Sequence, residues 1–388
     1  SVRQRGDEHW VFVKGAPERV FRMAQAWLTP EGERPFDSAA REQVQAQARA
    51  MAQRGLRVLA LAYRRLPQPL DPSEGVPEPS GLVLIGLVGM MDPPRPGVLE
   101  AIQDCHRAGI RVLMITGDHA ETARAIAHEL GLADRDSPVL TGVDLQQMDN
   151  AILQEQVQHV NVFARVTPEQ KLRIVRALQA NGEVVAVTGD GVNDAPALKA
   201  ADVGIAMGRS GTDVAREAAD IVLADDNFVS IRNAVEEGRI AFDNVRNATF
   251  FLLSTGMGSI LLFFLTLLAG LPVPMLAAQL LWLNLVTNGL QVVALAFEPG
   301  DRSVLLRKPR SRNEGIISPL LWERTVIVGA LIAVATFWSF QQEYARTGNL
   351  TYAQTVALTT MVLFQNFHVG NCRSEHRSAF LLSPLRNP

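Results

Sequence analysis

Two long uncharged runs near the carboxyl end constrain the fold of this chain more than any other feature. Residues 250–271 and 273–297 contain no Asp, Glu, Lys or Arg. A helix needs about 20 apolar residues to cross a bilayer, and each run exceeds that length. Residues 325–342 and 351–372 are two further candidate spans, the second of them more polar. We therefore expect a helical transmembrane domain with four spans over residues 244–388. The alternative is that these runs form buried helices of a large soluble protein.

The basic residues around the spans predict their orientation. Residues 298–315 carry five of them, Arg302, Arg307, Lys308, Arg310 and Arg312. Residues 270–274 carry none, and residues 343–350 carry only Arg346. The positive-inside rule places the basic segment in the cytoplasm. We expect a multi-pass plasma-membrane protein whose soluble domains are cytoplasmic.

The part of the chain before the spans has a different composition. The 388 residues have a formal net charge of -3, but the residues up to Ala248 carry -7 and the remainder +4. No basic stripe stands out, so the composition gives no support to a nucleic-acid partner. The two cysteines, Cys105 and Cys372, are far apart in the sequence, which argues against a structural disulfide and agrees with a reducing compartment.

Residues 81–243 alternate between apolar runs of strand length and amphipathic stretches. Strands are expected at residues 82–91, 110–115, 160–163, 184–187 and 203–207. Helices are expected at residues 97–108, 120–130, 168–180, 194–200 and 212–219. Continuously apolar strands separated by helices predict a doubly wound α/β domain, with a parallel sheet and an active site at the carboxyl ends of its strands. Residues 1–80 are expected to form a smaller unit that ends in a proline-rich segment.

Aspartates follow the ends of several expected strands. Asp92 follows the first strand, a Thr-Gly-Asp sequence at residues 116–118 ends the second, and Asp190 follows the fourth. A carboxylate placed before a glycine and a helix start offers oxygen ligands to a hard cation, beside N–H groups that hold phosphate. The spacing of Asp190 and Asp194 lets one ligate Mg2+ while the other orders the loop. Lys171, at the start of a helix, is suited to contact a phosphoryl group. The alternative is that each aspartate only caps a helix.

Five segments of the sequence stand out together: residues 13–18 (Val-Lys-Gly-Ala-Pro-Glu), 92–95 (Asp-Pro-Pro-Arg), 114–118 (Met-Ile-Thr-Gly-Asp), 164–171 (Ala-Arg-Val-Thr-Pro-Glu-Gln-Lys) and 188–198 (Thr-Gly-Asp-Gly-Val-Asn-Asp-Ala-Pro-Ala-Leu). Their combination resembles the haloacid-dehalogenase phosphotransferase core and, within it, the P-type ATPases of the type II, calcium-pump-like subfamily. The resemblance implies a partial α+β nucleotide-binding domain over residues 1–80 and a phosphorylation domain over residues 81–243. It also implies ATP and Mg2+ as cofactors.

The resemblance implies a role for each matching residue. Mg2+ would be held at Asp190 and Asp194. The catalytic residues that handle the phosphoryl group would be Lys171, Thr116, Gly117, Asp118 and Asn193. The nucleotide would be bound by Lys14, Arg57, Arg165 and Asp92.

One family motif is absent from the sequence. The P-type ATPases form their covalent intermediate on the aspartate of an Asp-Lys-Thr-Gly-Thr motif, which this sequence does not contain. The resemblance implies that this motif lies upstream, so that the chain is the carboxyl-terminal part of an ion pump with the amino-terminal half as its partner. One alternative is a regulatory fragment that binds nucleotide or pairs with an intact pump. The other is a membrane-anchored phosphatase, which would need an Asp-x-Asp nucleophile at a strand end, and none appears there.

Neutral polar residues in the expected spans are candidate ligands for the transported cation. Asn284, Thr287 and Asn288 share one helix face, in a phrase that resembles the sixth membrane helix of type II calcium ATPases. The same resemblance places Ser259, Asn288 and Gln365 where calcium pumps carry carboxylates. Ca2+ favours carboxylate ligands, so a site for two calcium ions is not expected. A single cation, a monovalent ion and a non-ionic substrate remain open.

Overall fold

The computed structural model describes residues 2–5, 8–54, 56–66, 79–90, 94–312 and 314–375. Asp92 and the proline-rich segment at residues 67–78 lie outside the described residues. The chain divides into two compact units. The first comprises Ser1–His106 and Arg111–Ser230, and the second comprises Arg107–Ile110 and Ile231–Pro388.

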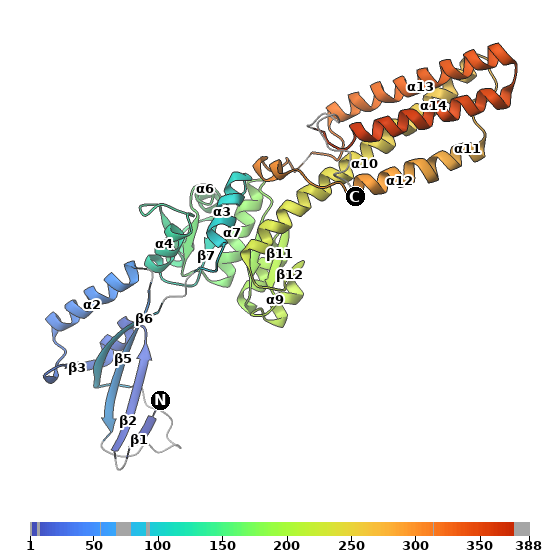
Figure 1. Cartoon of the computed structure of the whole chain (residues 1–388). Coiled ribbons are helices and arrows are strands. Elements are labelled where there is room, and N and C mark those ends of the chain that lie inside the picture. The colour runs from blue at the N-terminus through green and yellow to red at the C-terminus, as the bar shows by residue number, and fades with distance from the viewer. Residues whose placement is uncertain are drawn as a thin grey trace. The chain divides into compact units, whose positions relative to one another are not determined.

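The amino-terminal part of the first unit is a six-stranded sheet with the order β1-β2-β5-β6-β3-β4 (Figure 1). The strands are β1 (Val2–Arg5), β2 (Glu8–Gly15), β3 (Ala24–Thr29), β4 (Gly32–Pro35), β5 (Arg57–Leu66) and β6 (Leu82–Met90). Helices α1 (Pro17–Met23) and α2 (Ser38–Gln53) contact β5 and β6. Buried Ala60, Leu82 and Leu84 on the strands pack with Phe21 and Val44 on the helices, which leaves the other sheet face to solvent.

The structure corrects the assignment of one strand. The run at residues 82–91 was expected to open the α/β domain, but β6 pairs antiparallel with β5 and parallel with β3. Its burial is not continuous, because Leu82 and Leu84 are buried whereas Ile85 is exposed. A strand with one buried and one solvated face is typical of a largely antiparallel sheet. The expected domain boundary at residue 81 therefore falls within this sheet.

The rest of the first unit is an α/β domain, as the sequence predicted. One parallel sheet has the order β7-β9-β8 and the other the order β10-β11-β12. The strands are β7 (Met114–Ile115), β8 (Val139–Thr141), β9 (Val162–Ala164), β10 (Ala186–Gly189), β11 (Val203–Met207) and β12 (Ile221–Leu223). The helices are α3 (Val98–Arg107), α4 (Ala120–Glu129), α5 (Gly142–Gln147), α6 (Asn150–Gln156), α7 (Pro168–Ala180), the 3-10 turn η1 (Val192–Asp194), α8 (Ala195–Ala200) and α9 (Asp213–Ala218).

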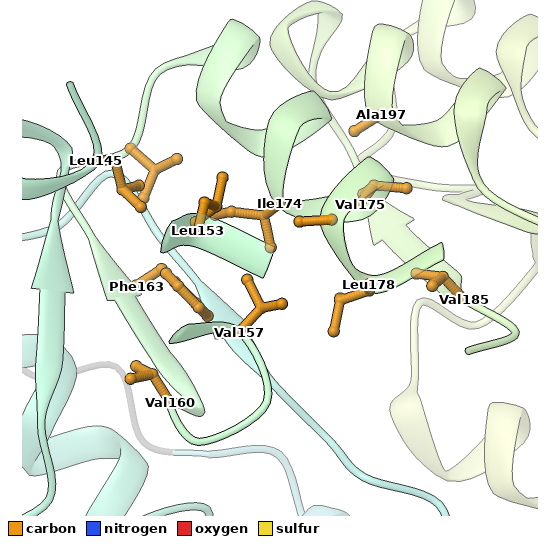
Figure 2. Close-up of a cluster of buried hydrophobic side chains, with 12 residues drawn as sticks. Leu145, Leu153, Val157, Val160, Phe163, Ile174, Val175, Leu178, Val185 and Ala197 are labelled. Atoms are coloured by element: carbon orange, nitrogen blue, oxygen red, sulfur yellow. The ribbon is translucent and has the colours of Figure 1, made fainter. Parts of the chain in front are cut away.

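Helix α7 packs into the main core of this domain. Figure 2 shows Ile174 and Leu178 of α7 among Phe163 of β9, Val185 and Ala197, all of them buried. Removing a side chain of this size from water stabilises a fold by about 1.5–3 kcal/mol. The helix begins after Thr167, whose hydroxyl accepts a bond from the backbone N–H of Gln170. This packing fixes the first turn of α7 beside the end of β10.

The second unit is largely helical. Its elements are most of α10 (Phe228–Leu268), α11 (Ala277–Trp282), the π-helical segment η2 (Leu283–Asn288), α12 (Gly289–Ala296), the 3-10 turn η3 (Arg302–Leu306), α13 (Pro319–Thr347) and α14 (Leu350–Asn371). Among the described residues, three helices are long and apolar enough to cross a membrane, Phe228–Leu268, Ala277–Ala296 and Pro319–Thr347. They coincide with the first three expected spans. Helix α14 coincides with the fourth and is more polar.

Helices α13 and α14 form a tight hairpin and lie side by side in Figure 1. Helix α13 ends at Thr347, and the Gly348 that caps it has a φ of 67°, the left-handed conformation that glycine adopts without strain. Asn349 then caps α14 by accepting a hydrogen bond from Tyr352 N–H at 3.1 Å. Buried Phe340 of α13 and Ala357 of α14 belong to one core that also includes residues of α10 and η2.

Candidate functional site

A lysine and an aspartate form an ion pair at the carboxyl end of β10. Lys171 Nζ, in the first turn of α7, lies 2.6 Å from Asp194 Oδ1. The other carboxylate oxygen, Oδ2, accepts hydrogen bonds from the backbone N–H groups of Asp190 (3.2 Å) and Gly191 (3.1 Å). Asp194 therefore holds the Asp190 turn and the Lys171 ammonium together.

The surroundings of Asp194 favour its charged form. Burial alone would raise the pKa of this carboxyl, but the Lys171 ammonium and the N–H groups of Gly191 and Asp190 outweigh burial and lower the pKa below its ordinary value. Gly189 is needed at this point, because a Cβ there would lie 2.5 Å from the Asp194 Cβ. The end of β10 can approach the carboxylate only without a side chain.

Asp190 presents an exposed carboxylate beside this ion pair. Its backbone carbonyl accepts a hydrogen bond of 2.8 Å from Thr212 N–H, which anchors the turn to the start of α9. Asn193, in the same turn, is also exposed. No group of three or more His, Cys, Asp or Glu in the described residues could form a metal cage. Mg2+ usually takes one or two protein carboxylates and fills its shell with waters and phosphate oxygens, so Asp190 fits Mg2+ without such a cage.

The Thr-Gly-Asp segment after β7 lies against the loop that precedes α7. Thr116 O accepts a hydrogen bond from Val166 N–H at 3.2 Å, and Asp118 O accepts one from Arg165 N–H at 3.1 Å. The Thr116 hydroxyl accepts from Asp118 N–H at 3.1 Å. Gly117 and the Arg165 side chain are exposed. These bonds place three of the predicted residues at the carboxyl ends of β7 and β9, where the α/β topology predicted a site.

Asp226 is a further residue of this region that the sequence analysis missed. It follows β12 with a φ of 55°, and it is buried. Its carboxylate accepts hydrogen bonds from the backbone N–H groups of Gly208 (2.7 Å), Arg209 (2.9 Å) and Ser210 (2.8 Å). These bonds, that from Arg209 above all, lower the pKa of Asp226 to about 2 although burial opposes the shift. Asp226 thus fixes the loop after β11.

The loop that Asp226 holds leads directly to the Asp190 turn, since Thr212 bonds to the Asp190 carbonyl. The left-handed backbone conformation of Asp226 is visible in the structure but leaves no mark in the sequence. In the sequence, the aspartate pair at residues 225–226 before a helix resembles an ordinary helix cap. This explains why it was missed.

Lys14 and Arg57 lie on the six-stranded sheet and not on the parallel sheets that carry Lys171 and Asp190. Both are exposed. Lys14 of β2 is paired with Leu61 of β5, and Arg57 lies four residues away on β5, so both side chains are on the same sheet face. Exposed Phe12 shares this face, which therefore combines apolar surface with positive charge.

The candidate ion ligands differ in exposure. Gln365 is completely buried, Asn288 and Thr287 are buried, and Asn284 is exposed. Asn288 donates a hydrogen bond of 3.1 Å to Asn284 Oδ1. Ser259 donates to the carbonyl of Thr255 in its own helix at 3.1 Å.

Comparisons with protein families match most of the chain. A haloacid dehalogenase-like hydrolase model matches residues 17–202, and a second model of that description matches residues 171–235. The carboxyl-terminal region of cation-transporting ATPases matches residues 272–388.

Curated relatives match the chain from end to end. A calcium-transporting ATPase of Bacillus subtilis is 43% identical over 387 residues, covering 100% of this chain and 43% of the relative. A probable cation-transporting ATPase F of Mycobacterium tuberculosis is 43% identical over 393 residues, with the same two coverages. Calcium-transporting ATPase 1 of Saccharomyces cerevisiae is 41% identical over 384 residues, covering 97% of this chain and 40% of the relative.

The chain thus spans less than half the length of these relatives. The comparisons agree with the α/β domain that carries Lys171 and Asp190, and with the apolar helices that follow it. The chain belongs to the P-type cation-transporting ATPase family, of which it contains the haloacid dehalogenase-like domain and the carboxyl-terminal membrane region.

Proposed function

We propose that this chain is the carboxyl-terminal part of an ATP-driven cation pump. The observation that carries the proposal is the convergence of Lys171, Asp194 and the exposed Asp190 at one strand end. A cation, an ordered acidic turn and a free carboxylate suit a transferred phosphoryl group and its metal ion.

Each residue of this edge has a distinct task in the proposal. Asp190 would hold Mg2+, which supplies charge neutralisation to the phosphoryl oxygens when bound. Asp194 keeps the turn in place and orients Lys171, whose ammonium would contact a phosphoryl oxygen. The Gly117 N–H would donate a hydrogen bond to the same group, and the Thr116 hydroxyl would donate one in place of its bond to Asp118 Oδ2. Asp118 positions Thr116 through their mutual hydrogen bonds.

The side chains of Asn193 and Arg165 are exposed near these loops, and each has a role in the proposal. Asn193 would order the Asp190 turn, and Arg165 would reach the nucleotide phosphates. The phosphoryl acceptor would be an aspartate outside these 388 residues, since the sequence contains no Asp-Lys-Thr-Gly-Thr motif.

The exposed face of the six-stranded sheet would bind the nucleotide. Phe12 offers an aromatic surface to a purine ring, with Lys14 two residues away on the same face. Arg57 on the neighbouring strand would contact the phosphates. Asp92 is a further residue predicted to bind the nucleotide.

The helices of the second unit would form a multi-pass domain in the plasma membrane, with the soluble domains in the cytoplasm. The basic segment between α12 and α13 supports this orientation. The transported cation would be bound among Ser259, Asn284, Thr287, Asn288 and Gln365. A regulatory fragment that pairs with an intact pump is the second candidate, favoured by the absent motif.

The experiment is phosphorylation of the chain reconstituted with the amino-terminal half of the pump. Labelled ATP should give an acid-stable phosphoenzyme only with both halves present, whereas label on this chain alone would contradict an external acceptor. Lys171→Met should abolish labelling. Lys199→Met is the matched control, because Lys199 is an exposed lysine in α8, and it should label normally. No labelling by the paired halves would favour the regulatory fragment.

A further inference from the structure

Two cationic side chains of the connection between α12 and α13 have no counter-charge in the described part of the chain. Residues 306–312 read Leu-Arg-Lys-Pro-Arg-Ser-Arg and belong to the second unit. Lys308 and Arg310 are exposed, and neither has an ion-pair or hydrogen-bond partner among the described residues. Arg307 differs, because its guanidinium lies 2.7 Å from the carboxylate of Asp243. The excess positive charge of this surface therefore lies on Lys308 and Arg310.

Helix α10 holds Arg310 in a defined place. The guanidinium carbon of Arg310 lies 3.2 Å from the centre of the Phe242 ring, and that of Arg246 lies 5.8 Å from the same ring. Arg246 also binds the chain beyond Arg310, since it pairs with Glu314 at 2.8 Å and its Nε donates a hydrogen bond of 2.8 Å to Ile316 O. An aromatic face attracts a cation but leaves its N–H groups without an acceptor. Arg310 is therefore positioned by the protein and still able to bind an anion.

The contacts with α10 place this surface beside the bilayer. The expected span that starts at Phe250 follows Arg246 by four residues and Phe242 by eight, which correspond to about 6 and 12 Å along a helix. The headgroup region is about 5–8 Å deep on each side of a bilayer, and attraction between charges extends about 8 Å further in physiological salt. Trp322, near the start of α13, is 49% exposed, and tryptophan is typical of the membrane–water interface. The cations beside Phe242 are thus within reach of lipid phosphates.

An anionic phospholipid is the partner that fits this surface. Its phosphate binds an arginine through paired N–H groups and a lysine as a point charge. A zwitterionic lipid such as phosphatidylcholine carries its own ammonium group, which would meet like charges here. Anionic lipids instead attract basic residues that lie next to a membrane-spanning helix. Charge complementarity therefore favours a headgroup with a net negative charge.

We propose that Lys308 and Arg310 bind the headgroup phosphate of an anionic phospholipid in the cytoplasmic leaflet. The inference rests on the membrane orientation proposed above and adds a lipid of defined charge to the partners of the chain. Residues 307 and 314 are both joined to α10 by ion pairs. A lipid bound between them fastens the connection between α12 and α13 to the membrane surface.

The test is photo-crosslinking of the whole chain in phosphatidylcholine vesicles that contain a trace of a photoactivatable lipid. The reactive group is carried either by phosphatidylglycerol or by phosphatidylcholine, and mass spectrometry locates the cross-linked peptides. One basic residue near an anionic lipid raises the association about fivefold, so residues 306–322 should label at least about fivefold more with phosphatidylglycerol. High salt should reduce this preference, because it screens the charges.

Variants separate the charge of these residues from their structural role. Lys308→Gln with Arg310→Gln should abolish the preference for phosphatidylglycerol, whereas Lys308→Arg with Arg310→Lys should retain it. The control, Lys199→Gln with Arg346→Gln, removes exposed basic side chains elsewhere and should leave the labelling unchanged. Circular dichroism shows whether each variant is folded.

Any of four outcomes would overturn the inference. They are equal labelling of residues 306–322 by the two lipids, unchanged labelling of the glutamine double variant, loss of the preference in the variant that keeps both charges, and displacement of the lipid by millimolar inorganic phosphate, which would identify a soluble anion as the ligand. Phosphoenzyme formation by the paired halves is measured separately, so failure of this lipid site and failure of the proposed pump chemistry are distinguishable.

Discussion

The ion pair between Lys171 and Asp194 gives the sharpest test of the site geometry. The perturbation is Asp194→Asn, which keeps the size of the side chain and removes its charge. The variant weakens the 2.6 Å contact with Lys171 and the two hydrogen bonds from the Asp190 turn. Because these contacts hold the turn, both stability and Mg2+ binding should fall.

The magnitude follows from the burial of the pair. A hydrogen bond to a charged group contributes about 1.5–3 kcal/mol, and breaking a fully buried ion pair costs about 3–5 kcal/mol. The side chains of Lys171 and Asp194 are 21% and 11% exposed, so solvent screens the pair in part. We expect a loss of about 2 kcal/mol in the free energy of unfolding. In a domain of this size the melting midpoint should fall by about 4–8 °C.

The assay is calorimetry of the reconstituted chain, following the transition of the first unit. Asp213→Asn is the matched control, since Asp213 is 87% exposed in its ion pair with Arg216. An exposed pair contributes about 0–1 kcal/mol, so this variant should melt within a few degrees of the unmodified chain.

The stability that Asp194 contributes should depend on pH in a definite direction. The pKa of Asp194 is lowered in the folded chain, so its stabilisation is present above the ordinary carboxyl pKa and is lost as the pH falls through the folded value. The difference between Asp194→Asn and the unmodified chain should therefore vanish in acid. Equal midpoints for the Asp194 and Asp213 variants at neutral pH would refute the reasoning.

Three further predictions concern other positions. Gly189→Ala should weaken Mg2+ binding, measured by titration calorimetry, because its Cβ would lie 2.5 Å from the Asp194 Cβ and displace that residue; unchanged affinity would contradict the packing. Asp226→Asn should destabilise the chain at neutral pH but not near pH 2, because the pKa of Asp226 is about 2 and its stabilisation disappears as the pH falls from 3.8 through that value. Melting scans that show the same difference between variant and unmodified chain at every pH in this range would exclude the mechanism. The hydrogen bond to Glu33 is the main reason that the pKa of Tyr63 is raised to about 12, so Glu33→Gln should return the absorbance titration toward 10.0, and an unaltered titration would exclude that bond as the cause.

Local signals predicted several elements to the residue. Helix α7 spans Pro168–Ala180 as expected, because Thr167 caps it and Pro168 suits its first turn. Strand β11 likewise matches Val203–Met207. Helix α10 continues into the first expected span without a break.

The misses have physical reasons. Strand β6 contains an apolar run, and an apolar run does not reveal which sheet it joins, because that depends on pairing with β5 far away in the sequence. The expected strand at residues 110–115 is reduced to Met114–Ile115, although its apolar character continues over Val112 and Leu113. The apolar character of these residues indicates that they are removed from solvent, but it does not show which of them form hydrogen bonds with a neighbouring strand.

The candidate site was predictable in its parts but not in its contacts. The spacing of Asp190 and Asp194 indicated one ligand and one ordering residue, and Asp194 accepts two hydrogen bonds from the Asp190 turn. The metal roles of both aspartates stay predictions. Its bond to Lys171 joins residues 23 positions apart and depends on how α7 packs. Asp226 lay beyond sequence reasoning, because its left-handed backbone and its three N–H donors appear only in the fold.

Helix α10 is longer than any bilayer requires. Its 41 residues extend about 60 Å, roughly twice the thickness of a hydrocarbon core. It contains no proline, and one unbroken hydrogen-bonded rod therefore continues from membrane into water. Within the second unit, Ile231 and Ser259 therefore belong to one continuous hydrogen-bonded element.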